Sequence, residues 1–194
     1  MKYISTRGQT APMDFSDVLL MGLAPDGGLM LPEHYPNIDS RTLDEWRTLS
    51  YPQLAMAIMQ RFATDIPAAD LQDIIERTYT SEVFGSDEIV PVRKLEDNLY
   101  ILGLSNGPTL AFKDVAMQFL GNAFEYVLKR KDARITIIGA TSGDTGSAAE
   151  YALRGKENIE VFMLSPHGKM SEFQRAQMYS LTDDNIHNIA IDGM

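Results

Sequence analysis

The sequence predicts an α/β protein in which a mainly helical first part precedes a parallel β-sheet. Up to about residue 85, apolar residues recur mostly at the spacing of amphipathic helices. From about residue 86 onward, strand-like segments alternate with helix-like segments, which is the pattern of βαβ units. We therefore expect one domain over residues 1–85 and a second over residues 86–194.

The first part is expected to contain one short strand and then helices. The strand is expected at Lys2–Ser5, and a first helix at Phe15–Leu23 ends before the turn-forming sequence APDGG. A helix at Tyr51–Thr64 has a proline in its first turn and apolar residues four positions apart. Another helix at Ala68–Tyr79 shows apolar residues at helical spacing. This part therefore depends on helix packing.

The second part is expected to form the sheet. Its expected elements are, in order, strands Ile89–Val92 and Leu99–Leu102, helix Lys113–Arg130, strand Arg134–Ile138, helix Ser147–Arg154, strand Ile159–Leu164, helix Ser171–Tyr179 and strand Ile186–Ile191. The β-branched run at residues 134–138 is typical of a buried parallel strand. Because ligands of such sheets bind beyond the carboxyl ends of the strands, the segments that follow the strands are candidate sites.

Composition excludes several classes of function. The chain has 17 Lys and Arg against 27 Asp and Glu, a net charge of −10, which disfavours binding to nucleic acid or anionic membranes. The absence of cysteine excludes disulfides and thiolate sites and fits a reducing compartment. No apolar run is long enough to cross a membrane, and the three histidines are too scattered for a metal site. We expect a cytoplasmic protein without a metal.

A lysine stands where a loop meets the strongest predicted helix. The segment SNGPTLAFKD at residues 105–114 forces a turn at Gly107 and Pro108 and places Lys113 at the helix start. Apolar neighbours and the positive end of the helix favour a neutral amine at Lys113, whereas Asp114 opposes it. A neutral amine can attack a carbonyl and form a Schiff base. The alternative is a solvated surface lysine.

A second segment, GATSGDTGS at residues 139–147, joins the best strand to a helix. Its glycines let backbone N–H groups approach a ligand, and the helix N-terminus adds partial positive charge. Hydroxyls are offered by Thr141, Ser142 and Thr145. The segment therefore predicts a cradle for a carboxylate or phosphate, although a plain βα turn is the alternative. It is neither a P-loop nor a G-x-G-x-x-G dinucleotide fingerprint.

These segments occur together with several others in a familiar order. In chain order they are YISTRG at residues 3–8, GLAPDGGL at 22–29, GPTLAFKD at 107–114, QFLG at 118–121, GATSGDTG at 139–146, GKMS at 168–171 and QM at 177–178. The chain resembles the N-terminal portion of threonine synthases, which are pyridoxal-phosphate (PLP) enzymes of the tryptophan-synthase-β-like fold. The resemblance implies that residues 86–194 form the first half of a fold type II, PLP-dependent, parallel-sheet catalytic domain.

The resemblance also implies a reaction and a set of site residues. The reaction is the lyase step that converts O-phospho-L-homoserine and water to L-threonine and phosphate in threonine biosynthesis. The catalytic residue is Lys113, which carries PLP as a Schiff base. The residues implied to bind the cofactor are Lys113, Ser142, Gly143 and Asp144, and those implied to bind the substrate are Thr141, Ser142 and Thr145. The resemblance is compatible with a homo-oligomer.

Two differences from the family bear on these expectations. Many members have Phe-His where this chain has Ser105-Asn106, and the wider fold often has Asn where Asp144 stands. The family's PLP-phosphate loop and the partner of the pyridine nitrogen lie further along its chain, so we expect an incomplete portion of the enzyme. The alternatives are a non-catalytic fragment or paralogue that binds a small anionic amino acid or phosphate, and a nucleotide-dependent enzyme.

Overall fold

The computed structural model describes residues 1–193, and its mixed α/β architecture confirms the predicted fold class. The chain divides into two compact units, with the first ending at Glu76 and the second beginning at Arg77. The division expected after residue 85 stays a prediction. Each unit is described separately below.

The first unit combines a two-stranded sheet with helices. Its elements are β1 (Tyr3–Ser5), α1 (Phe15–Met21), β2 (Met30–Pro32), α2 (Ser40–Trp46), α3 (Tyr51–Met59) and α4 (Ala68–Thr78), which runs into the second unit. Strand β1 pairs antiparallel with β2. The expected strand and three helices are present, whereas β2 and α2 were not predicted. Helix α1 ends earlier than expected because Gly22 adopts a positive φ of 74°.

The core of the first unit includes the apolar face of α4. Leu71, Ile74 and Ile75 are at most 1% exposed, and they stand at the helical spacing read from the sequence. Elsewhere in this unit, the guanidinium of Arg61, just after α3, lies 4.9 Å from the ring centroid of Trp46 at the end of α2. The helical pattern therefore identified the buried face correctly.

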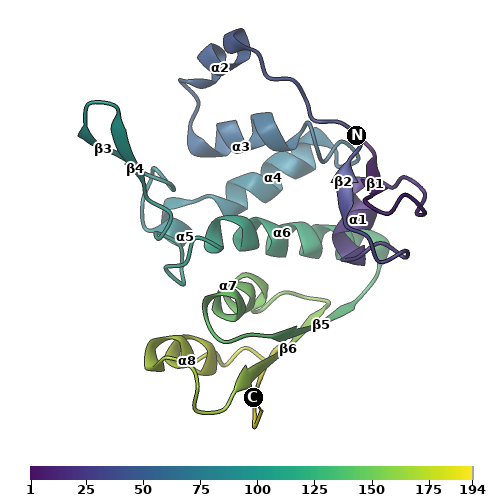
Figure 1. Ribbon diagram of the computed structural model, residues 1–194, viewed down its shortest axis with the longest axis vertical. Helices are drawn as coiled ribbons and strands as arrows, with labels where there is room; N and C mark the ends of the chain where they lie inside the picture. The colour runs from purple at the N-terminus through teal and green to yellow at the C-terminus, as the bar shows by residue number, and fades with distance from the viewer. Residues whose placement is uncertain (194) are drawn as a thin grey trace. The chain divides into compact units, whose positions relative to one another are not determined.

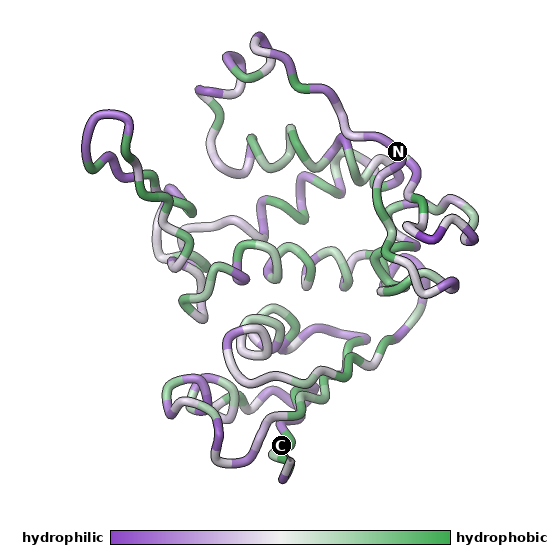
Figure 2. Tube along the Cα trace, viewed as in Figure 1, coloured by the Kyte–Doolittle hydropathy of each residue, from purple (hydrophilic) through white to green (hydrophobic). Residues whose placement is uncertain are grey.

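The second unit holds the hairpin, the long helix and the parallel sheet (Figure 1). Its further elements are α5 (Ser81–Phe84), β3 (Val92–Glu96), β4 (Leu99–Leu102), α6 (Asp114–Lys131), β5 (Ile135–Ala140), α7 (Asp144–Leu153), β6 (Ile159–Pro166), α8 (Glu172–Tyr179) and β7 (Ile186–Ile191). Figure 2 shows hydrophobic residues recurring along α6 and concentrated along β5 and β6. Alternation of strand and helix after α6 is thus confirmed.

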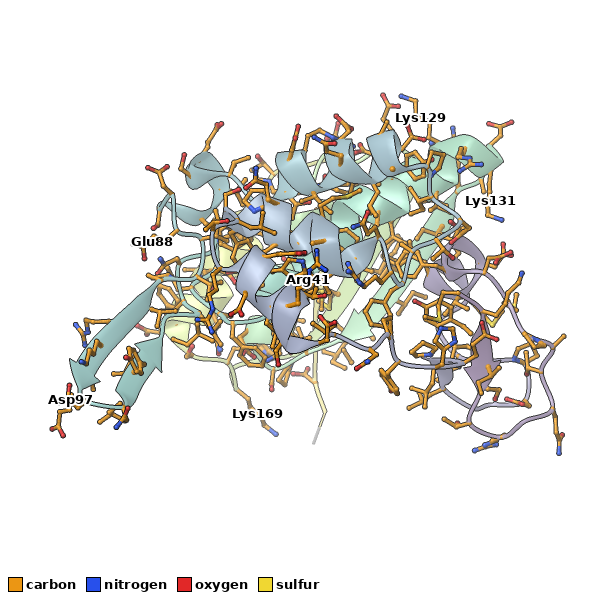
Figure 3. The ribbon with its side chains drawn as sticks, turned by 90° about the horizontal axis from the view of Figure 1, so that it is seen from above. Arg41, Glu88, Asp97, Lys129, Lys131 and Lys169 are labelled. Atoms are coloured by element: carbon orange, nitrogen blue, oxygen red, sulfur yellow. The ribbon has the colours of Figure 1, made fainter. Side chains whose placement is uncertain are left out.

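The two strands before α6 form an antiparallel hairpin of their own. The strand predicted at Ile89–Val92 was wrong: it begins at Val92, because the buried Ile89 adopts a φ of 60° and lies in a turn. Figure 3 shows Asp97 at the tip of the hairpin, where its carboxylate accepts a hydrogen bond from Lys94 Nζ at 2.7 Å.

The parallel sheet has the strand order β5-β6-β7. Strand β6 buries every second residue, whereas Ile138 of β5, on the opposite face, is 73% exposed. The expectation that β5 is a fully buried strand was therefore wrong, since within residues 1–193 only one face of the sheet is covered. The carboxyl end of β5 leads directly into the glycine-rich segment and α7.

Candidate functional site

The loop between β5 and α7 is shaped by the hydroxyl of Thr141. Its Oγ1 accepts hydrogen bonds from the backbone N–H groups of Gly143 at 3.2 Å and Gly146 at 3.1 Å. A Cβ atom added to Gly146 would lie 2.8 Å from the Cβ of Thr141, so a glycine is needed for this close approach. The substrate contact expected of Thr141 stays a prediction, because the structure shows its hydroxyl engaged within the loop.

The same loop leaves other polar groups open. The side chains of Ser142 and Thr145 are exposed, and Gly143, at the N-cap of α7, is buried. Because the first N–H groups of a helix lack intrahelical acceptors, this end of α7 carries partial positive charge. The loop therefore offers hydroxyls and a favourable potential to an anion. Helix α7 begins at Asp144, three residues before its predicted start.

The amine of Lys113 meets this loop at Asp144. Lys113 Nζ donates a hydrogen bond to Asp144 Oδ2 at 2.7 Å, although the two residues lie 31 positions apart in the sequence. The bond from the amine lowers the pKa of the Asp144 carboxyl below its ordinary value. The Lys113 side chain is 26% exposed and that of Asp144 49%, so the pair is accessible to a small molecule. The two predicted segments thus form one site.

The immediate surroundings of Lys113 differ from the expectation. The Phe112 ring centroid lies 4.9 Å from Lys113 Nζ, but Leu110 and Phe112 are themselves 59% and 61% exposed. The apolar environment expected around the amine is therefore limited to one aromatic ring. The backbone is also unusual here, since Leu110 adopts a positive φ of 61° before α6 begins at Asp114.

Asp114 holds the turn that precedes Lys113. Its fully buried carboxylate accepts hydrogen bonds from Thr109 N at 2.9 Å and from Thr109 Oγ1 at 2.8 Å. A Cβ on Gly107 would lie 2.5 Å from Asp114 Oδ2, so the glycine allows this close packing. Asp114 is therefore bound to Thr109, and Asp144, rather than Asp114, is the carboxylate bonded to the amine.

Sequence reasoning gave no role to two glutamines of α8. Gln177 Nε2 donates to Thr109 O at 3.0 Å, and the side chain of Gln174 lies against Gly143. Their position could have been inferred from two features of the sequence. The two glutamines are three residues apart on one helix, and that helix follows β6, whose carboxyl end lies beside that of β5. Helix α8 therefore adds to the site.

Among the described residues, no group of His, Cys, Asp or Glu side chains is arranged to hold a metal ion. Within the same residues, no helix is both long and apolar enough to cross a bilayer.

Comparison with known proteins gives a consistent result. A family model described as "Threonine synthase N terminus" matches residues 2–79. The threonine synthases of Methylobacillus glycogenes and Corynebacterium glutamicum are 59% and 55% identical over the whole chain, which covers 42% and 41% of their lengths. The chain therefore spans about two fifths of the length of the curated relatives it matches.

Solved structures agree with the sequence comparisons. A PLP-bound threonine synthase from Brucella melitensis superposes with a TM-score of 0.94 at 44% identity, over 100% of this chain and 41% of that one. The yeast enzyme gives a TM-score of 0.92 at 44% identity, with the same coverage of 100% and 41%. By sequence and by fold, this chain corresponds to the N-terminal portion of threonine synthases.

Proposed function

We propose that this chain provides the lysine-bearing part of a cytoplasmic threonine synthase, which converts O-phospho-L-homoserine and water to L-threonine and phosphate with PLP. One observation carries the proposal: the Lys113 amine and the glycine-rich loop meet at the carboxyl end of β5, through the 2.7 Å bond to Asp144. The identity of 59% to a threonine synthase supports the substrate, and a PLP-bound relative supports the cofactor.

The residues of the site fit PLP. The cofactor carries an aldehyde, which needs an accessible amine, and the Lys113 side chain is partly exposed. Ser142, Gly143 and Asp144 are proposed to lie against the cofactor, since Gly143 presents backbone only and Asp144 is within hydrogen-bond distance of the amine. When bound, PLP supplies an electron sink for the substrate's carbanion. The Lys113 amine is proposed to carry protons at the substrate carbons.

The proposed substrate contacts are the hydroxyls of the loop. Thr141, Ser142 and Thr145 are proposed to hold the substrate carboxylate near the positive end of α7. Ser142 and Thr145 are exposed, whereas Thr141 Oγ1 already accepts two backbone hydrogen bonds. We therefore expect Ser142 and Thr145 to contact the carboxylate directly and Thr141 to fix the loop that presents them.

The proposal is tested by titrating the chain with PLP and following its absorbance, with Lys113→Ala and Lys113→Arg as variants. We expect saturable binding with a spectral change in the wild type and none in either variant, because arginine keeps the charge without a reactive amine. Calorimetry with O-phosphohomoserine then compares wild type and Lys113→Ala. Equal affinity without any dependence on PLP would overturn the proposal in favour of a non-catalytic module that binds an anionic amino acid.

We also propose that a domain boundary follows residue 85, with residues 86–194 forming the start of the catalytic domain. The Gly85 φ of 64° ends α5 and supports a break there. Limited proteolysis followed by mass spectrometry should cleave first between residues 85 and 91. Preferred cleavage within α4 would contradict this boundary.

Light scattering on the undigested chain would show whether it forms a homo-oligomer.

A further inference from the structure

Helix α8 contacts both segments of the site. Gln177 Nε2 donates to Thr109 O at 3.0 Å, a contact between residues 68 positions apart. Three residues earlier, Gln174 lies so close to Gly143 that a Cβ there would come within 2.6 Å of its Cδ. Ser171 Oγ holds the Gln174 amide in place by donating to its Oε1 at 3.0 Å. One helix face thus lies against the Lys113 segment and the loop of Asp144.

The contact of Gln177 completes the bonding of Thr109. Thr109 is buried, and its N and Oγ1 both donate to the buried carboxylate of Asp114, directly beside Lys113. Among the side-chain hydrogen bonds within residues 1–193, the one from Gln177 is the only one that reaches the Thr109 carbonyl. A buried carbonyl without a donor is unfavourable, so loss of the Gln177 amide would loosen the turn that places Lys113.

Helix α8 is also held to the sheet by contacts that do not involve these glutamines. Its C-terminal end is attached to the sheet, because Tyr179 Oη and Ser165 Oγ share a hydrogen bond of 2.8 Å and Asn188 donates to Met178 O at 3.1 Å. Met178 is also buried. Removing one glutamine donor should therefore leave the helix in place and change the turn before Lys113.

We propose that Gln177 is a positioning residue for Lys113: through Thr109 and Asp114 it fixes the turn that holds the amine beside Asp144. The importance of this role for catalysis rests on the proposed function, in which Lys113 is the reacting amine. The substitution Gln177→Met retains the length of the side chain and removes the amide that donates to Thr109 O. Arg175→Met, at an exposed position of the same helix, is the matched control.

Two readouts on the intact chain test the proposal. The first is the rate at which Lys113 is acylated by an amine-reactive ester, measured by mass spectrometry relative to the exposed Lys129 at the far end of α6 (Figure 3). The second is the dissociation constant for PLP. In Gln177→Met we expect the ratio of Lys113 to Lys129 acylation rates to rise about fivefold. We also expect the dissociation constant for PLP to rise about fivefold. This factor corresponds to the net free energy of one hydrogen bond. Arg175→Met should leave both unchanged.

The outcomes separate this proposal from the proposed function. An unchanged acylation ratio and unchanged PLP affinity in Gln177→Met would overturn the positioning role. Faster acylation of Lys113 and Lys129 alike would also overturn it, because that result reports general loosening of the fold. Failure of the wild type to bind PLP would overturn the proposed cofactor, while the acylation ratio still decides whether Gln177 positions Lys113.

Discussion

Two glycine-rich loops each contain an aspartate, but they use its carboxylate in different ways. In the first unit, Asp26 Oδ1 accepts hydrogen bonds from Ser5 Oγ at 2.7 Å and Gly28 N at 2.9 Å, and its Oδ2 accepts from Gln9 N at 3.0 Å. These bonds, led by that from Ser5, lower the pKa of Asp26 to about 2. Both oxygens of this carboxylate are thus engaged, by Gly28 of the loop and by Ser5 and Gln9 of the N-terminal segment.

The loop before α7 is arranged differently. Asp144 is bonded to the Lys113 amine from another segment, while the hydroxyl groups of Ser142 and Thr145 stay exposed. A loop whose carboxylate takes up the nearby donors stabilises a turn, whereas a loop with open donors beside an amine can bind a ligand. Glycine content alone therefore does not distinguish a structural loop from a binding loop; the partners of the donors do.

The largest expected effect concerns Glu150, on the helix that follows the second loop. Glu150 is fully buried, its Oε1 has no hydrogen-bond partner among the described residues, and burial raises its pKa from 4.5 to about 7. Because the folded state holds this proton more tightly than the unfolded state, the protein loses stability as the pH rises from 4.5 through 7. The pH dependence expected from Asp26 has the opposite sign. Glu150→Gln should therefore gain about 2–3 kcal/mol relative to wild type between pH 5 and pH 8. Urea unfolding followed by circular dichroism measures this, and a pH-independent difference would contradict it.

The next effect tests the closed packing of the first loop. In Gly28→Ala, the added Cβ would meet Ser5 Oγ and lie 3.0 Å from both Asp26 Oδ1 and Thr6 Oγ1. We expect a loss of about 1–3 kcal/mol in the free energy of unfolding, as for other overpacked sites. Fluorescence of Trp46, the single tryptophan, reports on this unit in urea. Gly193→Ala, where a Cβ meets nothing within 4 Å, is the control.

A smaller effect is expected from the charge of Asp26, because that carboxylate is accessible to water. Its pKa is lowered from 3.8 to about 2, so the stability it contributes is present above pH 3.8 and is lost as pH falls toward 2. Asp26→Asn should lower the urea concentration at the unfolding midpoint at pH 7. It should also make the acid-induced change in Trp46 fluorescence less steep between pH 3.8 and pH 2. An acid limb identical to that of the wild type would show that other carboxyls control it.

The smallest effect is expected in the second loop itself. In Gly143→Ala, the added Cβ meets only the amide end of the Gln174 side chain. We therefore expect a change in unfolding free energy within about 0.5 kcal/mol. The double variant with Gln174→Ala should match the wild type. A loss as large as that of Gly28→Ala would remove the difference between the two loops.

Local patterns were sufficient for much of the fold. Helical spacing identified the buried face of α4, and the β-branched run at 135–138 marked a strand of the parallel sheet. These features depend on neighbours within one or two turns of chain, which a single sequence displays. The glycine-rich segment was expected between the strand and the following helix, and it does connect β5 to α7 at the carboxyl end of the strand.

Contacts between distant residues were not predictable in the same way. The bonds from Lys113 to Asp144 and from Gln177 to Thr109 join positions 31 and 68 apart, and no local pattern encodes such pairs. Nor was the positive φ at Leu110 predictable, because it is rare for a residue of this type and gives no signal in composition.

The assignment of Lys113 as the amine that binds PLP can be tested directly. The chain is incubated with PLP, reduced with borohydride and digested, and the covalent pyridoxyl group is located by mass spectrometry. We expect modification on the peptide that contains Lys113, with little on exposed lysines such as Lys129, and none at this peptide in Lys113→Ala. Modification spread evenly over the exposed lysines, or none at Lys113, would contradict it.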